Sequence, residues 1–184
     1  MAKQQRMIIT GVSGLLGNNL GFCLKDDYTI LGLFHHHACA IEGNMLKQVD
    51  LTDPDRVRSI VREFQPDIII HCAALSDIEY CESHQDLATK ANVLATRHLI
   101  EAIDETPCQF IFISTDSIYD ETNGPLIDEQ GAVNPSNHYS WTKIEAEQEA
   151  LKHGHTLVLR TNIFGWNIQE KFSLGEWIIH EFNK

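Results

Sequence analysis

A tyrosine and a lysine lie four residues apart, at Tyr139 and Lys143. On a helix, residues at this spacing share one face, so we expect the ammonium of Lys143 to lie beside the phenol of Tyr139. An adjacent positive charge favours the phenolate and is expected to lower the pKa of Tyr139 toward neutrality. The pair is therefore suited to exchange a proton with a carbonyl or alcohol group.

Hydroxyl groups are clustered upstream of this pair, in Ser114-Thr115-Asp116-Ser117. They follow an apolar run, so they are expected at the end of a strand, where the hydroxyl of Thr115 can orient the same substrate oxygen. Side chains of these types also hydrogen-bond local backbone in ordinary turns, so the cluster alone decides nothing.

A glycine-rich turn follows the first apolar run, with Gly11, Gly14 and Gly17 spaced three apart. This spacing lets the backbone bend tightly, approach a pyrophosphate and pack a new helix against a sheet. The helix N-terminus then offers N–H donors and a partial positive charge to phosphates. Glycine also ends strands in ordinary turns. The order of this turn, the hydroxyl cluster and the Tyr–Lys pair favours a dinucleotide site.

Strand-like and helix-like segments alternate along the chain. We expect strands at residues 7–10, 28–34, 46–49, 67–71, 109–114 and 156–161. We expect helices at residues 14–25, 86–104 and 136–153, a weaker one at 176–182, and one that Asp53 caps and Pro66 closes. This alternation predicts an α/β fold with a doubly wound parallel sheet, which binds ligands at the carboxyl ends of its strands.

Three packing expectations follow from the same patterns. The helix at 86–104 is expected to carry one apolar stripe, and the strand at 109–114 is expected to be buried on both faces. The polar segment 117–136 is expected to be a functional loop. The stripe comprises Leu87, Ala91, Leu94, Ala95 and Leu99.

The composition is that of one globular domain of 184 residues with a net charge of −12, which argues against binding to nucleic acid or an anionic membrane surface. No apolar run is long enough to span a bilayer, and the N-terminus lacks the apolar core of a signal peptide. The five cysteines form no Cys-x-x-Cys pair, which favours reduced thiols in the cytoplasm over disulfides or structural zinc.

Taken together, these motifs resemble the extended short-chain dehydrogenases/reductases, and most of all the dTDP-4-dehydrorhamnose reductases. The resemblance covers about residues 7–168. It implies an NAD(P)-binding Rossmann fold and an oxidoreductase that transfers hydride to a nucleotide-linked keto-sugar. The matching stretches are residues 10–17, Asp50-Leu51, residues 71–74, Asn92, residues 114–116, Tyr139 to Lys143 and residues 160–165.

The resemblance also implies a role for individual residues. The catalytic set would be Thr115, Tyr139 as proton donor and Lys143. The glycines would shape the pyrophosphate turn, Asp50 and Leu51 would hold the adenine, and Asn92 would support the lysine. The full set of cofactor-binding residues would be Gly11, Gly14, Leu15, Leu16, Gly17, Asp50, Leu51, Ala73, Ala74, Asn92, Tyr139, Lys143 and Asn162.

One departure concerns the end of the second strand, which reads Phe34-His35-His36-His37. A carboxylate there would select NAD by accepting the ribose 2′-hydroxyl, whereas a neutral or positive pocket admits the 2′-phosphate. We therefore favour NADP(H) modestly over NAD(H). A solvated loop is the alternative, and a metal site is disfavoured because consecutive residues do not converge well on one ion.

A second departure is length, because members of this family continue well beyond the length of this chain. We expect residues 1–168 to be the dinucleotide-binding domain and residues 169–184 to begin an incomplete substrate-binding region. Cofactor binding is then expected to survive, and efficient catalysis is not. The resemblance also implies a homodimer formed through the helices that carry Asn92 and Tyr139.

Two other functions remain open. One is a nucleotide-sugar epimerase or dehydratase, although Asp116 followed by Ser117 is more like the reductases. The other is a non-catalytic, NADP-binding regulatory subunit, since the regulatory subunit of methionine adenosyltransferase also resembles this chain.

Overall fold

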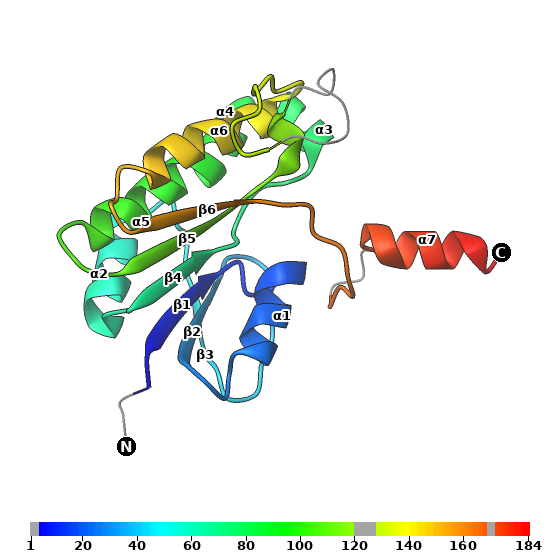
Figure 1. The fold of residues 1–184 in the computed structure, drawn as a ribbon. Coiled ribbons are helices and arrows are strands. Elements are labelled where there is room, and N and C mark those ends of the chain that lie inside the picture. Colours follow the sequence, from blue (N-terminus) through cyan, green and yellow to red (C-terminus); the bar gives the residue numbers. More distant parts are fainter. Residues whose placement is uncertain (1–3, 120–127, 169–171) are drawn as a thin grey trace.

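The computed structural model describes residues 4–119, 128–168 and 172–184. Its six strands form one parallel sheet in the order β3-β2-β1-β4-β5-β6, and the direction of winding reverses between β1 and β4 (Figure 1). The predicted α/β fold with a doubly wound parallel sheet is thereby confirmed. The strands are β1 (Arg6–Thr10), β2 (Thr29–Phe34), β3 (Met45–Gln48), β4 (Ile68–His71), β5 (Gln109–Ser114) and β6 (Thr156–Arg160).

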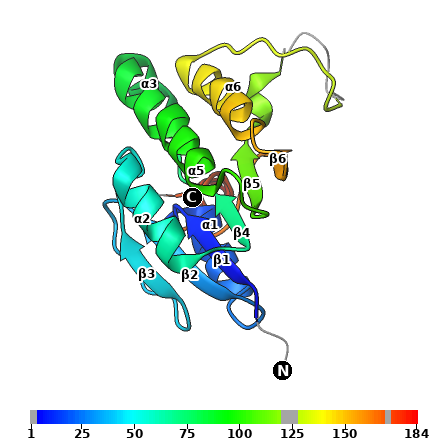
Figure 2. The same cartoon turned by 90° about the vertical axis from the view of Figure 1, so that its left-hand side faces the viewer.

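Helices cover both faces of the sheet (Figure 2). Helix α1 (Leu15–Cys23) lies on one face, while α2 (Pro54–Phe64), α5 (Ala95–Ile103) and α6 (His138–Ala150) lie on the other. The shorter elements are α3 (Ile78–Ser83), α4 (Gln85–Thr89), the π-helix η1 (Lys90–Leu94), the 3-10 helix η2 (Asp116–Ile118) and the last helix α7 (Leu174–Phe182).

Side-chain alternation along the strands builds one hydrophobic core on each face. In β1, Ile8 joins the core beneath α2, α5 and α6, whereas Met7 and Ile9 join the core beneath α1. Helix α2 begins as predicted, because the carboxylate of Asp53 accepts hydrogen bonds from the first-turn amides and proline occupies the first position.

The face of β5 and β6 that is turned away from α5 and α6 is less buried than the sequence predicts. Phe110 and Phe112 of β5 are fully buried, but Ile111 and Ile113 on the opposite face are only partly buried. On the neighbouring strand, Leu157 is 53% exposed. The expectation that this strand is buried on both faces is therefore wrong, because α1 packs on the β1 side of that face.

The helix predicted at 86–104 is divided into α4, the π-helix η1 and α5. A π-turn accommodates an extra residue and rotates the helix face that follows. The predicted apolar stripe is therefore wrong at Leu87, which is 47% exposed, whereas Asn92, Val93 and Thr96 are buried. Sequence periodicity also missed α3, which is too short to show a repeat; its signal was the N-cap Asp77.

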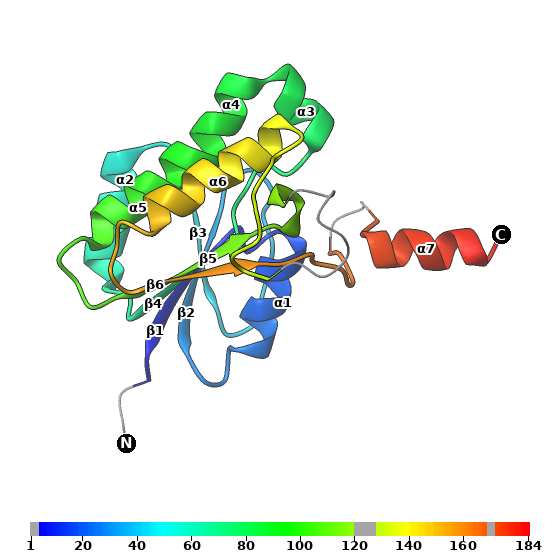
Figure 3. The same ribbon diagram turned by 45° about the horizontal axis from the view of Figure 1, so that its top comes forward.

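Two features lie toward the end of the chain. The loop expected at 117–136 falls partly outside the described residues, and Tyr119 forms an isolated bridge with Val133. Helix α7 begins with a capping box between Ser173 and Glu176 and projects away from the sheet (Figure 3). Among the helices that the structure describes, none is long and apolar enough to cross a membrane.

Candidate functional site

The glycine turn joins the carboxyl end of β1 to α1. Gly11 has a φ of +67°, and a Cβ there would lie 2.8 Å from the Cα of Ala73. A Cβ on Gly17 would overlap the carbonyl of Gly11, whereas one on Gly14 would meet only that carbonyl oxygen, at 3.3 Å. The backbone packing thus requires glycine at 11 and 17. At Gly14 the absence of a side chain is not required by packing and leaves space for a ligand at the start of α1.

The first turn of α1 has the character of an anion site. Gly14 is its N-cap, none of the side chains that the structure describes caps it, and the first turn contains no acidic residue. The first backbone N–H groups of a helix have no partner within the helix and carry the positive end of its dipole. The amides of Leu15 and Leu16 therefore suit a phosphate group.

A cleft of about 700 Å³ lies along the carboxyl ends of β1, β2, β3 and β4. The topology thereby brings together residues that lie far apart in the sequence. The cleft runs from the glycine turn to the histidine run that follows β2. Of the residues predicted to bind a cofactor, Gly11, Gly14, Asp50, Leu51, Ala73 and Ala74 line it.

The histidine run faces a carboxylate at one end of this cleft. The Nε2 atom of His35 lies 3.8 Å from Oδ2 of Asp50, and the ring centroids of His35 and His36 are 3.7 Å apart. Partial burial acts to raise the pKa of Asp50, but hydrogen bonds from Thr52 and the nearby histidines outweigh it and lower this pKa. Asp50 thus stays ionised and can accept hydrogen bonds through Oδ2.

Lys143 is a buried cation, only 3% exposed. Its Nζ donates one hydrogen bond, to the carbonyl of Ile113 at 2.6 Å, and lies 4.1 Å from the ring centroid of Phe112. Burial lowers the pKa of Lys143 to about 8. Among the described residues, no carboxylate lies within ion-pair distance of this ammonium. The group therefore has donor capacity left for a polar ligand.

Tyr139 lies one turn before Lys143 on α6, but its pKa moves opposite to the expectation. Burial and the neighbouring Cys81 and Asp116 raise the pKa of Tyr139, and a hydrogen bond with Thr115 offsets them only in part. The expected lowering was wrong, because the hydrogen bond of Lys143 goes to a backbone carbonyl instead. Tyr139 is thus protonated at neutral pH, as a proton donor must be.

Thr115 directly follows β5 and is the N-cap of the 3-10 helix η2. Its hydroxyl accepts a hydrogen bond from the amide of Ser117 and lies 3.1 Å from the hydroxyl of that residue. The predicted catalytic trio of Thr115, Tyr139 and Lys143 is thus gathered by β5 and α6. None of the three lines either cavity, and Thr115 and Lys143 are buried.

The side chain of Asn92 contacts two separate segments of the chain. It lies in η1, is 2% exposed, and its Oδ1 accepts a hydrogen bond from the amide of Leu75 at 2.7 Å. Its Nδ2 donates to the carbonyl of Leu75 and to the hydroxyl of Thr142, whose proton goes to the carbonyl of Tyr139. The side chain thus joins the segment after β4 to the helix that carries Tyr139.

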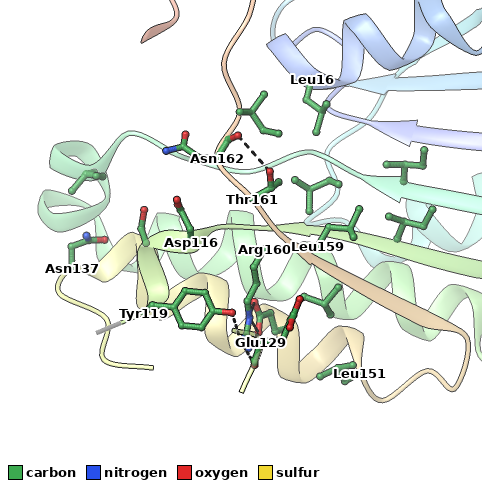
Figure 4. Close-up of a pocket in the computed structure, with 18 of the residues that line it drawn as sticks. Leu16, Asp116, Tyr119, Glu129, Asn137, Leu151, Leu159, Arg160, Thr161 and Asn162 are labelled. Atoms are coloured by element: carbon green, nitrogen blue, oxygen red, sulfur yellow. Dashed lines mark hydrogen bonds and ion pairs between the residues drawn. The ribbon is translucent and has the colours of Figure 1, made fainter. Parts of the chain in front are cut away.

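A second cavity, of about 1630 Å³, lies along β5, β6 and the segment that follows β6 (Figure 4). Leu16 and Asn162, both predicted from the sequence, are among its lining residues. A network that sequence reasoning missed lies at its edge. The guanidinium of Arg160 donates to Glu147 at 2.7 Å and to the hydroxyl of Tyr119 at 3.1 Å. No local pattern predicts this network, since its members lie on three elements.

Comparison with known proteins gives consistent results. The family model described as "RmlD substrate binding domain" matches residues 5–172. The chain is 35% identical over 150 residues to methionine adenosyltransferase 2 subunit beta of Danio rerio, covering 81% of this chain and 44% of that protein. It is 31% identical to the probable low-salt glycan biosynthesis reductase Agl14 of Haloferax volcanii, covering 76% and 46% respectively.

Solved structures extend the comparison to the fold. A hypothetical dTDP-4-dehydrorhamnose reductase of Sulfolobus tokodaii superposes with a TM-score of 0.78 at 31% identity, covering 88% of this chain and 58% of that one. The dTDP-4-dehydrorhamnose reductase of Bacillus anthracis, solved in complex with NADP, gives 0.76 at 28% identity, covering 91% and 58%. The chain spans about half the length of the curated relatives it matches. By its match over residues 5–172, this chain belongs to the RmlD substrate binding domain family.

Proposed function

We propose that this chain binds a nicotinamide dinucleotide and serves the reduction of a nucleotide-linked keto-sugar, with Tyr139 as proton donor. The observation that carries this proposal is the buried ammonium of Lys143. Within the described part of the chain it has a single hydrogen bond, and it lies one helical turn from a protonated tyrosine. A buried cation left without a carboxylate is costly, so such a group usually serves a ligand or a reaction.

The residues along the cleft fit a dinucleotide. The uncapped start of α1 suits the pyrophosphate, and the bare Gly14 leaves space for it. Ionised Asp50 suits the amino group of adenine, and small Ala73 and Ala74 allow a ribose to approach the backbone. In the second cavity, Asn162 is positioned on the segment that would lie beside the nicotinamide.

When bound, the reduced nicotinamide supplies a hydride to a carbonyl carbon. The protein's part is to provide the proton and the orientation. Tyr139 gives its phenolic proton to the carbonyl oxygen, and Thr115 donates a hydrogen bond to the same oxygen. Lys143, one turn away, has N–H donors beyond the one that bonds Ile113, and we propose that they bind ribose hydroxyls.

The cofactor preference is proposed to be NADP over NAD. Strand β2 ends without a carboxylate, and His35, His36 and His37 line the cleft there. Neutral or protonated imidazoles can donate hydrogen bonds to a 2′-phosphate, whereas a carboxylate at this position would repel it. The complex of the Bacillus anthracis relative with NADP supports this preference.

We propose that residues 1–168 form the cofactor-binding domain and that residues 169–184 begin the region that recognises the sugar. Because substrate contacts remote from the reacting carbon position it, the affinity of this chain for a sugar nucleotide is expected to be weak.

A second candidate function is that of a non-catalytic subunit. It is supported by the relative from Danio rerio, whose name describes it as a subunit of methionine adenosyltransferase. This reading shares the dinucleotide site and differs only in lacking turnover.

One titration distinguishes the reductase from the non-catalytic subunit. The fluorescence of NADPH is followed on mixing with the chain and then on adding a dTDP-4-keto sugar. The reductase proposal predicts enhanced fluorescence on binding, then slow, Tyr139-dependent loss of NADPH absorbance with sugar. Binding without any oxidation, in a chain extended to the full length of its relatives, would contradict the reductase proposal and favour the subunit. Absence of binding would contradict both.

A further inference from the structure

His71 is the last residue of β4, fully buried between the sheet and α5, and the proposed chemistry does not use it. Its imidazole packs near the rings of Phe110 and Phe112, with centroids 5.9 and 5.8 Å away. Both ring nitrogens are nevertheless hydrogen-bonded. Nδ1 lies 2.6 Å from the hydroxyl of Thr10 and Nε2 lies 3.1 Å from the hydroxyl of Thr96.

The proton positions on Thr10, His71 and Thr96 follow from the backbone groups that Thr96 and Thr10 contact. The hydroxyl of Thr96 donates to the backbone carbonyl of Asn92 at 2.7 Å, and a carbonyl can only accept. Thr96 therefore has no proton left for His71, so Nε2 of His71 must carry the proton and donate it. Because burial and the charge of Lys143 lower the pKa of His71 to about 3, the ring is neutral and Nδ1 carries no proton.

At the other end, the hydroxyl of Thr10 must then donate to Nδ1 of His71. This leaves the oxygen of Thr10 free to accept the backbone amide of Ala73, which it does at 3.1 Å. That amide lies beyond the last paired residue of β4, where the sheet offers it no carbonyl. The four hydrogen bonds thus all have the same direction, from the amide of Ala73, the first donor, to the carbonyl of Asn92, the last acceptor.

The backbones of Ala73 and Gly11 lie against each other beside the glycine turn. A Cβ on Gly11 would lie 2.8 Å from both the Cα and the amide nitrogen of Ala73, so the two backbones are in close contact. Thr10, which holds the amide of Ala73, is the residue immediately before Gly11. A displacement of Ala73 would therefore shift the glycine turn as well.

We infer that His71, together with Thr10 and Thr96, is a positioning relay that fixes the end of β4 against the glycine turn and so pre-forms the dinucleotide cleft. The cofactor part of this inference rests on the proposed function. The relay itself does not. Without a partner, the hydroxyl proton of Thr10 could adopt any rotamer. The acceptor Nδ1 of His71 fixes the direction of that proton. None of the three side chains is expected to touch the cofactor.

The first test reads the tautomer and needs no ligand. Nitrogen-15 chemical shifts of the His71 imidazole, recorded between pH 6 and 8, are expected to show a neutral ring protonated at Nε2. A ring protonated at Nδ1, or one that becomes charged in this range, would overturn the relay whatever the protein binds.

The second test asks whether the relay positions the cleft or only stabilises the core. Thr96→Val keeps the shape but removes the acceptor, whereas Thr96→Ser keeps the hydroxyl. Ile103→Val, buried at the far end of α5, is the matched control for lost stability. Thr96→Val is expected to speed amide exchange at Ala73 and weaken NADPH binding, each about tenfold, with Thr96→Ser within about twofold of wild type.

The outcomes are distinct. If Thr96→Val lowers the melting temperature as Ile103→Val does but leaves Ala73 exchange and NADPH affinity unchanged, His71 is only a core residue and the inference fails. If the wild-type protein binds no dinucleotide, the proposed function fails, and the tautomer and the Ala73 exchange rate still decide the relay.

Discussion

The ammonium of Lys143 is fixed to the backbone carbonyl of Ile113, 2.6 Å away, across the interface between α6 and β5. This contact holds a cation at the carboxyl end of the sheet, one helical turn from Tyr139. It uses one of three N–H donors. The remaining donors, rather than any contact with the phenol, are what make the site suitable for ribose hydroxyls.

Lys143 is expected to make stability depend on pH. The folded protein releases the Lys143 proton near pH 8, whereas the unfolded chain keeps it to about pH 10.5. Between these values the unfolded state binds more protons, so this residue makes the free energy of unfolding rise with pH. Urea denaturation at pH 7.5 and 10 should show the rise in wild type relative to Lys143→Met. If the free energy of unfolding differs between wild type and Lys143→Met by the same amount at both pH values, burial does not lower the pKa of Lys143 as described.

The same variant separates stability from function. Removing a buried charge that has no ion pair with any described carboxylate is expected to raise the free energy of unfolding at pH 7 by on the order of 2 kcal/mol. NADPH affinity is expected to fall at the same time, about tenfold, as a charged hydrogen-bond donor is lost. Denaturation and fluorescence titration on one preparation measure both, and a variant that gains stability yet binds normally would remove Lys143 from the proposed site.

Tyr139→Phe is expected to leave dinucleotide affinity within about twofold of wild type, because the tyrosine acts on the substrate carbonyl. Loss of its proton should reduce any NADPH oxidation by about a hundredfold or more. Absorbance at the NADPH band measures turnover and fluorescence measures binding. A large loss of affinity instead would show that the phenol has a different role.

The glycine turn offers a matched pair of variants. Gly14→Val is expected to retain the fold, because its Cβ would meet only one backbone oxygen. It is expected to lose cofactor affinity, because the new side chain would occupy the space proposed for the pyrophosphate. Gly17→Ala is expected to destabilise the protein by about 1–3 kcal/mol, because its Cβ would overlap the Gly11 backbone. Thermal melts and NADPH titrations of both variants check this, and unchanged affinity in Gly14→Val would count against a pyrophosphate at this turn.

The histidine run is expected to discriminate between the two dinucleotides. Replacing His35 and His36 together by Gln should weaken NADP binding several-fold and leave NAD binding unchanged, since NAD has no 2′-phosphate. Calorimetric titration with each dinucleotide gives the ratio. Equal loss for both would indicate that the histidines shape the cleft without reading the phosphate, and a wild-type preference for NAD would refute the proposed selectivity.

Much of the fold was predictable because its signals are local. The Asp53-Pro54 start of α2 and the apolar run of β5 lie within a few residues of the structure they specify, and the bounds of β5 agree with the prediction. The alternation of such segments then implied the parallel sheet. Family resemblance, rather than spacing alone, supplied the individual site residues.

The remainder depended on burial and on contacts between distant segments. The pKa of Tyr139 was predicted to fall because Lys143 was assumed to face it, and the structure directs that ammonium to Ile113 instead. The π-turn at Asn92 and the hydrogen bonds of His71 connect elements across the sheet. No periodicity in the sequence encodes such contacts.

The central claim is that one dinucleotide contacts both the glycine turn and the buried ammonium of Lys143. A titration of nitrogen-15-labelled protein with NADP⁺, followed by NMR, tests it most directly. The account predicts saturable shifts in the amides of Leu15, Leu16 and Ala73 and in the ammonium of Lys143, all with one dissociation constant. Shifts confined to other surfaces, or none at millimolar NADP⁺, would contradict it.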